Sequence, residues 1–445
     1  MTLSTFSNLK KLALYLPQFH RIPENDEWWG EGFTEWTNVR RGKALFPGHT
    51  QPRVPTELGW YDLSDPAVME RQTELAQSHG IDGFVFYHYW FSGRRILEMP
   101  VDRLLASGRP EKLNYCLCWA NHTWGRNWDG REGEKKILLK QEHDADDDMA
   151  FIRSMFPHFE DKRYVRLNGK PVLLILWTHL FPDMKATTER WRTECRKAGI
   201  GDIYLVRCES HGAQPTPESE GFDAAYDFPH HQHFDNSTRM WAVEAEAMRT
   251  TPGFTGKIYS YPHVVARHLS RMHVPYRRFH TACLDWDNTA RKMLSAQILH
   301  DFTLPVYQHW VTELALDSLL QAQGQDHLLL FNAWNEWAEG TYLEPDELFG
   351  MERLQVTAAG LSAAENLYAG MLGGMSADQV TGYLEHLSMR DKLTQQWTQS
   401  LHRTEMPRAL EQAARATVAA QAAATWLGKQ IERLPANLRS RFRAE

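Results

Sequence analysis

Two glutamates have the spacing of a catalytic carboxylate pair. Glu336 and Glu339 lie three residues apart, directly after an apolar run that begins at residue 328. In a turn or helix, side chains at positions i and i+3 lie about 5–6 Å apart and face the same way. Two carboxylates this close do not easily both ionise, so one can hold a proton while the other stays anionic. Cleavage of a glycosidic bond needs this division of roles, and retaining enzymes hold their two carboxyl groups about 5–5.5 Å apart.

The residues around the pair distinguish it from an exposed helix start, which is the usual context of two glutamates at this spacing. Trp334, Asn335 and Trp337 flank the pair, and an apolar strand is predicted immediately before it. We therefore predict that Glu336 and Glu339 are catalytic and that the three flanking residues contact a substrate.

Eight short apolar runs predict the strands that position this pair. The runs are continuous rather than alternating in polarity, as expected for parallel strands covered on both faces, and helical segments lie between some of them. Eight such units favour a (β/α)8 TIM-type barrel over an open doubly wound sheet, and no GxGxxG or Walker-type loop follows any run. The runs are residues 12–16, 83–91, 115–119, 172–177, 204–208, 224–228, 281–286 and 328–334.

Two domains are predicted. Residues 1–370 form the barrel, with long βα loops over residues 17–65 and 230–277 that belong at its C-terminal, functional face. Residues 371–445 form a helical, Ala- and Arg-rich extension, which packs on the barrel or on a partner subunit. In an alternative interpretation, the extension makes peripheral contact with anionic lipid head groups. The arginines available for that contact are Arg433, Arg439, Arg441 and Arg443.

Composition and charge exclude several classes of protein. The chain of 445 residues is 42% hydrophobic and 24% charged, which is typical of a globular protein and not of a disordered or coiled-coil one. Its formal charge of -7 does not predict binding to nucleic acid. We find neither a signal peptide nor a membrane-spanning run, and the cysteine pattern suggests reduced thiols. A cytoplasmic protein is predicted, peripheral at the inner membrane if the extension contacts lipid; no oligomeric state is predicted.

Polar and aromatic residues at the predicted strand ends suit a sugar. Tyrosine hydroxyls and amides pair with sugar hydroxyls, and flat rings stack on sugar faces. Ten of the seventeen tryptophans fall within or just after predicted strand ends, as expected for the wall of a sugar cleft. The alternatives are a buried tyrosine bonded to backbone and an ion pair of Glu209 with Arg207. The predicted substrate contacts at these ends are Tyr15, His20, Tyr87, Tyr89, Trp119, Asn121, Trp124 and Glu209.

Neither a metal nor a cofactor is predicted. His230, His231 and His233 form a cluster, but they lack an accompanying HxxxH or CxxC pattern that would supply the defined geometry of a zinc site. His20 is likewise a lone histidine. There is no GxSxG nucleophile elbow, so acyl transfer is not predicted.

Seven strings carry a resemblance to a known family. They are YLPQFH (15–20), WWGEGFTEW (28–36), FPGHTQP (46–52), YHYWF (87–91), WANHTW (119–124), DNTARK (287–292) and NAWNEWAEGTYLEPD (332–346). These strings resemble the WbsX-type family of bacterial surface-polysaccharide clusters, which is related to glycoside hydrolase family 99, the endo-α-mannosidases and endo-α-mannanases. The resemblance covers about residues 10–355 and implies a (β/α)8 barrel.

The resemblance implies roles for the two glutamates. By its match to NEWxEG, Glu336 deprotonates the sugar 2-hydroxyl, which attacks C1 to give a 1,2-anhydro sugar. Glu339 protonates the leaving oxygen and later activates the acceptor. Two departures from the family pattern stand out: Ala338 replaces a histidine of the hydrolases, and LWTHLFPD (176–183) replaces an aromatic-arginine-proline sequence.

The implied function is cleavage or transfer of α-linked, mannose-like glycosyl units in bacterial O-antigen or capsule metabolism, with an oligo- or polysaccharide as substrate. One alternative is a cytoplasmic glycosyltransferase that builds the lipopolysaccharide O-antigen. Another is a non-catalytic, glycan-binding barrel.

Overall fold

Eight parallel strands form a closed barrel. The computed structural model describes residues 8–125, 137–209, 214–240, 250–322 and 324–403. The barrel closes because the first strand pairs with both the second and the last. In barrel order the strands are β1 (Leu9–Tyr15), β2 (Gly83–Phe91), β4 (Asn114–Trp119), β8 (Lys170–Ile175), β9 (Tyr204–Glu209), β10 (Ala224–Asp227), β12 (Arg278–Cys283) and β14 (His327–Asn332).

The predicted fold class is confirmed, since every predicted apolar run contains residues of one barrel strand. The run over 83–91 coincides with β2, whose nine residues are all buried. The run over 281–286 was placed three residues too late, because β12 begins with the polar residues Arg278 and His280. These side chains are buried through ion pairs rather than apolar packing.

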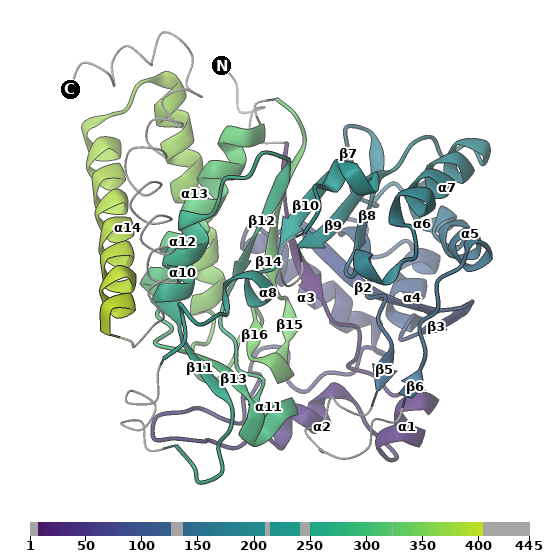
Figure 1. Cartoon of the computed structure of the whole chain (residues 1–445), viewed down its shortest axis with the longest axis horizontal. Helices are drawn as coiled ribbons and strands as arrows, with labels where there is room; N and C mark the ends of the chain where they lie inside the picture. The colour runs from purple at the N-terminus through teal and green to yellow at the C-terminus, as the bar shows by residue number, and fades with distance from the viewer. Residues whose placement is uncertain (1–7, 126–136, 210–213, 241–249, 323, 404–445) are drawn as a thin grey trace.

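Helices cover the outside of the barrel (Figure 1). Asp65 and Asp183 cap two of them by accepting hydrogen bonds from backbone N–H groups of the first turn. Among the described residues, only the 3-10 turn η4 (Pro217–Glu220) lies between β9 and β10. The helices are α3 (Pro66–Ser78), α4 (Met99–Ser107), α5 (Ala145–Ser154), α6 (Phe156–Glu160), α7 (Met184–Lys197), α10 (Tyr261–Ser270), α12 (Leu304–Ala322) and α13 (Glu352–Gly373).

Short elements gather at the C-terminal end of the barrel, toward the bottom of Figure 1. They come mainly from the long loops after β1, β4, β10 and β12, where the sequence predicts the functional face. These elements are α1 (Pro23–Trp29), α2 (Glu35–Arg40), β5 (Trp124–Gly125), β6 (Ile137–Leu139), α8 (Pro229–His233), β11 (Lys257–Ser260), α11 (Thr289–Lys292) and β13 (Gln297–His300).

The C-terminal extension begins with a long helix on the barrel. This helix, α14 (Ala377–Arg403), packs against α10, α12 and α13. The predicted boundary at residue 370 falls in the last turn of α13, and the division into two domains stays a prediction. The rest of the predicted helical extension, from residue 404 on and including the four C-terminal arginines, lies outside the described residues. Across the part of the chain that is described, every helix is too short or too polar to span a membrane.

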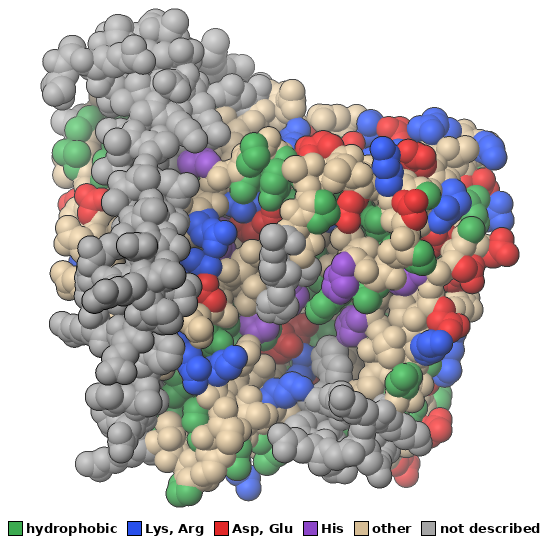
Figure 2. Space-filling view, in the orientation of Figure 1, with side chains coloured by type: hydrophobic (Ala, Val, Ile, Leu, Met, Phe, Trp, Pro, Cys, Tyr) green, Lys and Arg blue, Asp and Glu red, His purple; other side chains and the backbone are tan. Residues whose placement is uncertain are grey.

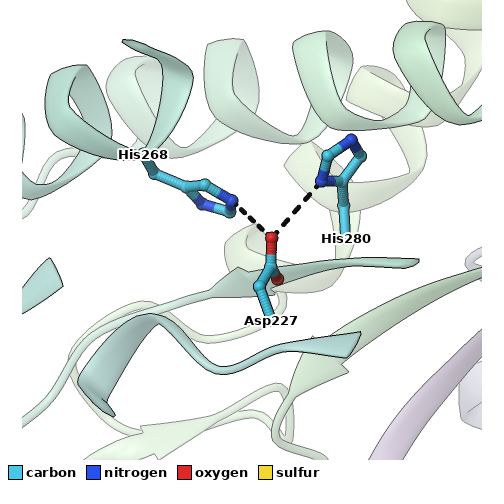
Figure 3. A group of neighbouring side chains, drawn as sticks. All are labelled: Asp227, His268 and His280. Atoms are coloured by element: carbon cyan, nitrogen blue, oxygen red, sulfur yellow. Dashed lines mark hydrogen bonds and ion pairs between the residues drawn. The ribbon is translucent and has the colours of Figure 1, made fainter. Parts of the chain in front are cut away.

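A buried ionic network joins the barrel wall to the outer helices (Figure 3). Asp227, at the end of β10, lies 2.7 Å from His268 Nε2 and 3.3 Å from His280 Nδ1. His280 Nε2 lies 2.8 Å from Asp317 of α12. Because Trp310 Nε1 donates to His268 Nδ1, His268 must carry its proton on Nε2 and donate it to Asp227. Every ring nitrogen in the network therefore already has a hydrogen-bond partner.

His280 is charged in this network. Burial by itself lowers the pKa of His280, but its hydrogen bonds to Asp227 and Asp317 raise the value to about 9. The two aspartates consequently share one imidazolium in a place with almost no solvent exposure. Removal of one partner from such a buried pair leaves an uncompensated charge.

His280→Gln should lower the free energy of unfolding by about 3–5 kcal/mol near pH 6, because Asp227 and Asp317 lose the imidazolium that lies between them. A pKa raised in the folded state gives stability that is full below the unfolded value of about 6.5 and is lost as pH rises through about 9. Urea unfolding across this range should show that loss in the wild type and not in the variant. His179→Gln, at an exposed position, is the control. Equal pH dependence in wild type and His280→Gln would contradict the assigned charge.

Candidate active site

The predicted glutamate pair lies where the last barrel strand ends. After β14 the chain forms a tight antiparallel hairpin, and both glutamates belong to it. This is the C-terminal end of the barrel, where the sequence predicts them. The elements of the hairpin are β15 (Asn335–Glu336), the 3-10 turn η6 (Trp337–Glu339) and β16 (Thr341–Tyr342).

Gly340 and Asp287 fix the turn that carries Glu339. Gly340 has a φ of +68°, and a Cβ there would lie 2.8 Å from the backbone nitrogen of Asp287. That nitrogen donates to the carbonyl oxygen of Glu339 at 2.6 Å. Asp287 is held in turn by His49 Nε2, at 2.7 Å from its Oδ2. The hairpin is thus bound to the loop that follows β12.

One guanidinium bridges three carboxylates at this site. Arg291 of α11 donates through NH1 to Glu339 at 2.6 Å and through NH2 to Glu336 at 3.2 Å. Its Nε donates to Glu35 of α2 at 2.7 Å. Bonds from an arginine to carboxylates are among the strongest hydrogen bonds in proteins. The two predicted catalytic residues are therefore neighbours, and a third glutamate joins them.

The environment raises the proton affinity of the pair. Burial, and then the negative charge of Glu339, raise the pKa of Glu336 above its ordinary value, and Arg291 opposes the rise. Burial also raises the pKa of Glu339, again against Arg291. One group of the pair can therefore hold a proton near neutral pH while the other stays anionic, as the spacing predicts.

The pair opens into a cavity of about 760 Å³. This is the size of pockets that enclose most of a small ligand. Figure 2 shows a hollow in this face of the molecule where acidic, histidine and basic side chains meet. The lining includes Glu35, Tyr87, Tyr89, His122, Trp29, Trp124, Trp177, His230, His231, Trp286, Arg291, Lys292, Glu336 and Glu339.

Tyr87, Tyr89 and Trp124 are predicted substrate contacts that the structure brings to the cavity. The two tyrosines follow one another on the inner face of β2, and burial raises the pKa of both well above the ordinary value. Their hydroxyls are therefore protonated and can donate to a sugar. Trp124 packs edge-to-face on Tyr89, with ring centroids 5.0 Å apart.

Three residues that flank the pair point away from the cavity. Trp337 Nε1 donates to Glu344 at 2.6 Å, and Asn335 bonds both backbone groups of Leu16. Trp334 is fully buried and packs on Phe84. The predicted substrate contacts of these residues are not supported by their positions. The reason is that backbone, carboxylate and aromatic groups of the core already engage these three side chains.

The other predicted contacts also lie outside the cavity lining. Tyr15 is buried in the barrel and donates to Gln72, while Trp119 stacks on Phe151 with centroids 3.8 Å apart. The remaining residues are buried too: Asn121 bonds the backbone of Trp177, Glu209 pairs with Arg278 at 3.2 Å, and His20 is 2% exposed. Asn121 still acts on the cavity indirectly, because it holds a tryptophan that lines it.

The histidine cluster does not converge. His230 stacks on Trp286 and its Nε2 lies 2.7 Å from Gln297, whereas His233 stacks on His268 away from the cavity. Elsewhere among the described residues, two groups are close enough to hold a metal: the network around Asp227, and a group on α12 and α14. In the former, the ring nitrogens are engaged as donors or acceptors, which leaves no lone pair for an ion. The latter comprises His309, Glu313 and His386.

Comparison with known proteins identifies the family. Residues 11–357 match the family described as Glycosyltransferase WbsX. The chain belongs to this WbsX family. Two proteins from strains of Xanthomonas campestris pv. campestris, both called Uncharacterized protein WxcX, are 40% identical to it over 356 residues. The match covers 80% of this chain and 50% of each relative, so the chain spans about half the length of the curated relatives it matches.

A solved structure of low sequence identity shares the fold of this WbsX-family chain. A structure named "Glycoside hydrolase-like protein" aligns with a TM-score of 0.50 at 13% identity, and covers 79% of this chain and 93% of that chain. A glycoside hydrolase family 99 endo-alpha-mannosidase from Bacteroides thetaiotaomicron aligns with a TM-score of 0.49 at 13% identity, over 80% of this chain and 97% of that one. The resemblance drawn from the seven strings is confirmed at the level of the family.

Glu35 and Arg291 are site residues that the sequence did not single out, whereas Trp177 lies in LWTHLFPD, a departure from the family pattern that put its substrate contact in doubt. Glu35 and Arg291 both lie inside strings that resemble the family, next to the last residues of WWGEGFTEW and DNTARK. A signal was therefore present: an acidic and a basic residue in short strings after predicted strands. What the sequence lacked was the proximity of two loops about 250 residues apart, which the hydrogen bond from Arg291 to Glu35 establishes.

Gly340→Ala should destabilise the WbsX-family chain by about 1–3 kcal/mol, because it adds a contact with Asp287 to the strain of a left-handed backbone. Thermal unfolding followed by circular dichroism measures the effect. Gly169→Ala is a matched control, since Gly169 has a φ of +77° and no atom within 4 Å of an added Cβ. If both variants lose the same stability, the close approach to Asp287 does not restrict the turn.

Proposed function

We propose that this chain is a carbohydrate-active enzyme that cleaves or transfers α-linked, mannose-like glycosyl units of bacterial surface polysaccharide. The observation that carries the proposal is the pair Glu336 and Glu339, bridged by Arg291 in a cavity lined with tryptophans. Paired carboxylates with raised pKa values suit acid–base chemistry, and exposed indole rings suit sugar faces. Membership of the WbsX family supports the same class of activity.

The proposed reaction is a retaining one through a 1,2-anhydro sugar. Glu336 takes the proton of the sugar 2-hydroxyl, whose oxygen attacks C1 as the glycosidic bond breaks. Glu339 gives its proton to the leaving oxygen. Glu339 then takes a proton from water or a sugar acceptor, which opens the three-membered ring at C1, and Glu336 returns a proton to O2. Both glutamates thus recover their starting protonation.

Transfer to a growing O-antigen or capsule is the second candidate for the same site. The description of the family as glycosyltransferases favours it. Its compartment would be the cytoplasm, at the inner membrane, where lipid-linked precursors are found. The five free, buried cysteines accord with a reducing compartment. In this candidate, a sugar hydroxyl takes the place of water in the second step.

Glu339→Gln should lower turnover at least about a hundredfold, because the amide does not supply a proton to the leaving oxygen. The test is incubation with a panel of α-linked bacterial polysaccharides, with products and their anomeric configuration read by NMR. Oligosaccharide binding, followed by tryptophan fluorescence, should be retained in the variant. Glu347→Gln, on an exposed side chain after the hairpin, is the control and should keep full turnover.

Unchanged turnover in Glu339→Gln would overturn the assignment. Binding without turnover in the wild type, unaffected by loss of either glutamate, would instead indicate a glycan-binding barrel.

Hydrolysis and transfer give different products. With a lipid-linked acceptor and an activated sugar, a transferase should extend the acceptor, which mass spectrometry detects as added sugar units. A hydrolase should release new reducing ends from polysaccharide and leave the acceptor unchanged. A second experiment with water as the sole acceptor serves as the reference for the rate of release.

A further inference from the structure

The hydrogen bonds from Arg291 to the two glutamates differ in length. Arg291 lies 2.6 Å from Glu339 and 3.2 Å from Glu336, so the former receives the shorter and stronger bond. The two side chains also differ in solvent exposure, because Glu339 is 22% exposed and Glu336 only 7%. Both differences favour a charge on Glu339 and a proton on Glu336.

Glu35 anchors Arg291 on the side away from the pair. It accepts from Arg291 Nε at 2.7 Å and also from Asn38 Nδ2 at 3.3 Å, one turn further along α2. With Nε anchored, the planar guanidinium has a fixed tilt, and its two remaining nitrogens reach the pair at unequal distances. Glu35 is 1% exposed and starts a helix whose N-cap is Thr34, so its own position is fixed.

We propose that Glu35 and Arg291 are positioning residues that place the single proton of the resting pair on Glu336. Substrate must then move that proton before the reaction starts. The proton passes from a carboxyl oxygen of Glu336 to one of Glu339, which leaves the total charge unchanged. This step rests on the proposed function, whereas the resting position of the proton does not.

The charges around the pair agree with this placement. Burial and Glu339 raise the pKa of Glu336, and Glu35 raises it further. Burial and Glu35 raise the pKa of Glu339 as well, whereas Arg291 and Lys292 lower it. The titratable groups that face the pair are Glu35 from α2, Tyr87 and Tyr89 from β2, Cys283 from β12, and Arg291 and Lys292 from α11.

Infrared spectroscopy of the whole chain without substrate locates the proton. A protonated carboxyl group absorbs apart from a carboxylate, and each Glu→Gln variant removes one contribution. In each variant the remaining glutamate titrates without its charged neighbour, so the pH at which its carboxylic-acid band disappears reports its own proton affinity. That pH should be higher for Glu336 in Glu339→Gln than for Glu339 in Glu336→Gln. Glu344, whose pKa burial raises to about 7, contributes equally to every spectrum and cancels.

Two further variants test the positioning role. Glu35→Gln removes a negative charge and should lower the pKa of Glu336 by about one unit, so its acid band titrates at lower pH. Arg291→Lys replaces the fork by a point charge and should raise the pKa of Glu339, so that a second acid band appears near neutral pH. Glu347→Gln should change neither titration. Circular dichroism verifies that each variant folds. If Arg291→Lys does not fold, the titration of Glu35→Gln alone tests the positioning role.

The outcomes separate this proposal from the proposed function. If the remaining Glu339 keeps its proton to a higher pH than the remaining Glu336 does, the placement of the proton is overturned, whatever the activity. An unchanged titration in Glu35→Gln overturns the role of Glu35. Conversely, a proton on Glu336 in a wild-type chain that turns over no glycan supports the placement and contradicts the enzymatic function.

Discussion

The candidate site depends on the compensation of buried carboxylates by one arginine. Burial of an ionised carboxylate costs several kcal/mol even after the protein relaxes, and Glu35, Glu336 and Glu339 surround a single guanidinium. Arginine suits this role because its fork offers separate N–H groups to separate acceptors. The four residues follow β1, β12 and β14, which are neighbours in the barrel. Closure of the barrel therefore assembles the charge cluster, and the cluster in turn ties three loops together.

A second polar layer beneath the cavity holds the hairpin that carries the pair. Glu344 accepts from Trp337, Tyr61 and Gln72, at 2.6, 3.0 and 2.6 Å. Tyr61 also accepts from Asn335, whose amide bonds the backbone after β1. Trp337 and Asn335 of the hairpin consequently pack and bond in the core, while Glu336 and Glu339 of the same hairpin face the cavity. The hairpin thus links the core of the barrel to the cavity.

The fold could be predicted from the sequence more fully than the site. Parallel strands under helices must be apolar on both faces, so all eight barrel strands could be recognised as runs, and β12 was misplaced only where ion pairs replace apolar packing. The residues that line the site were harder to predict than the strands. Tyr87, Tyr89 and Trp124 reach the cavity, but Tyr15 and Trp119 have the same residue types and similar places at strand ends and are buried in a hydrogen bond and an aromatic stack.

The sequence by itself determined the barrel, the position of Glu336 and Glu339 at the end of its last strand, and the resemblance to the WbsX family. These features depend on local patterns: apolar runs, the spacing of two glutamates and short strings. Only the tertiary structure decided which side chains face the cavity and which charges meet there. The contact of Arg291 with Glu35 joins loops about 250 residues apart, and no local pattern encodes a distance across a closed barrel. The same physical reason applies to Trp177, which reaches the cavity wall because Asn121 from the neighbouring strand holds its backbone.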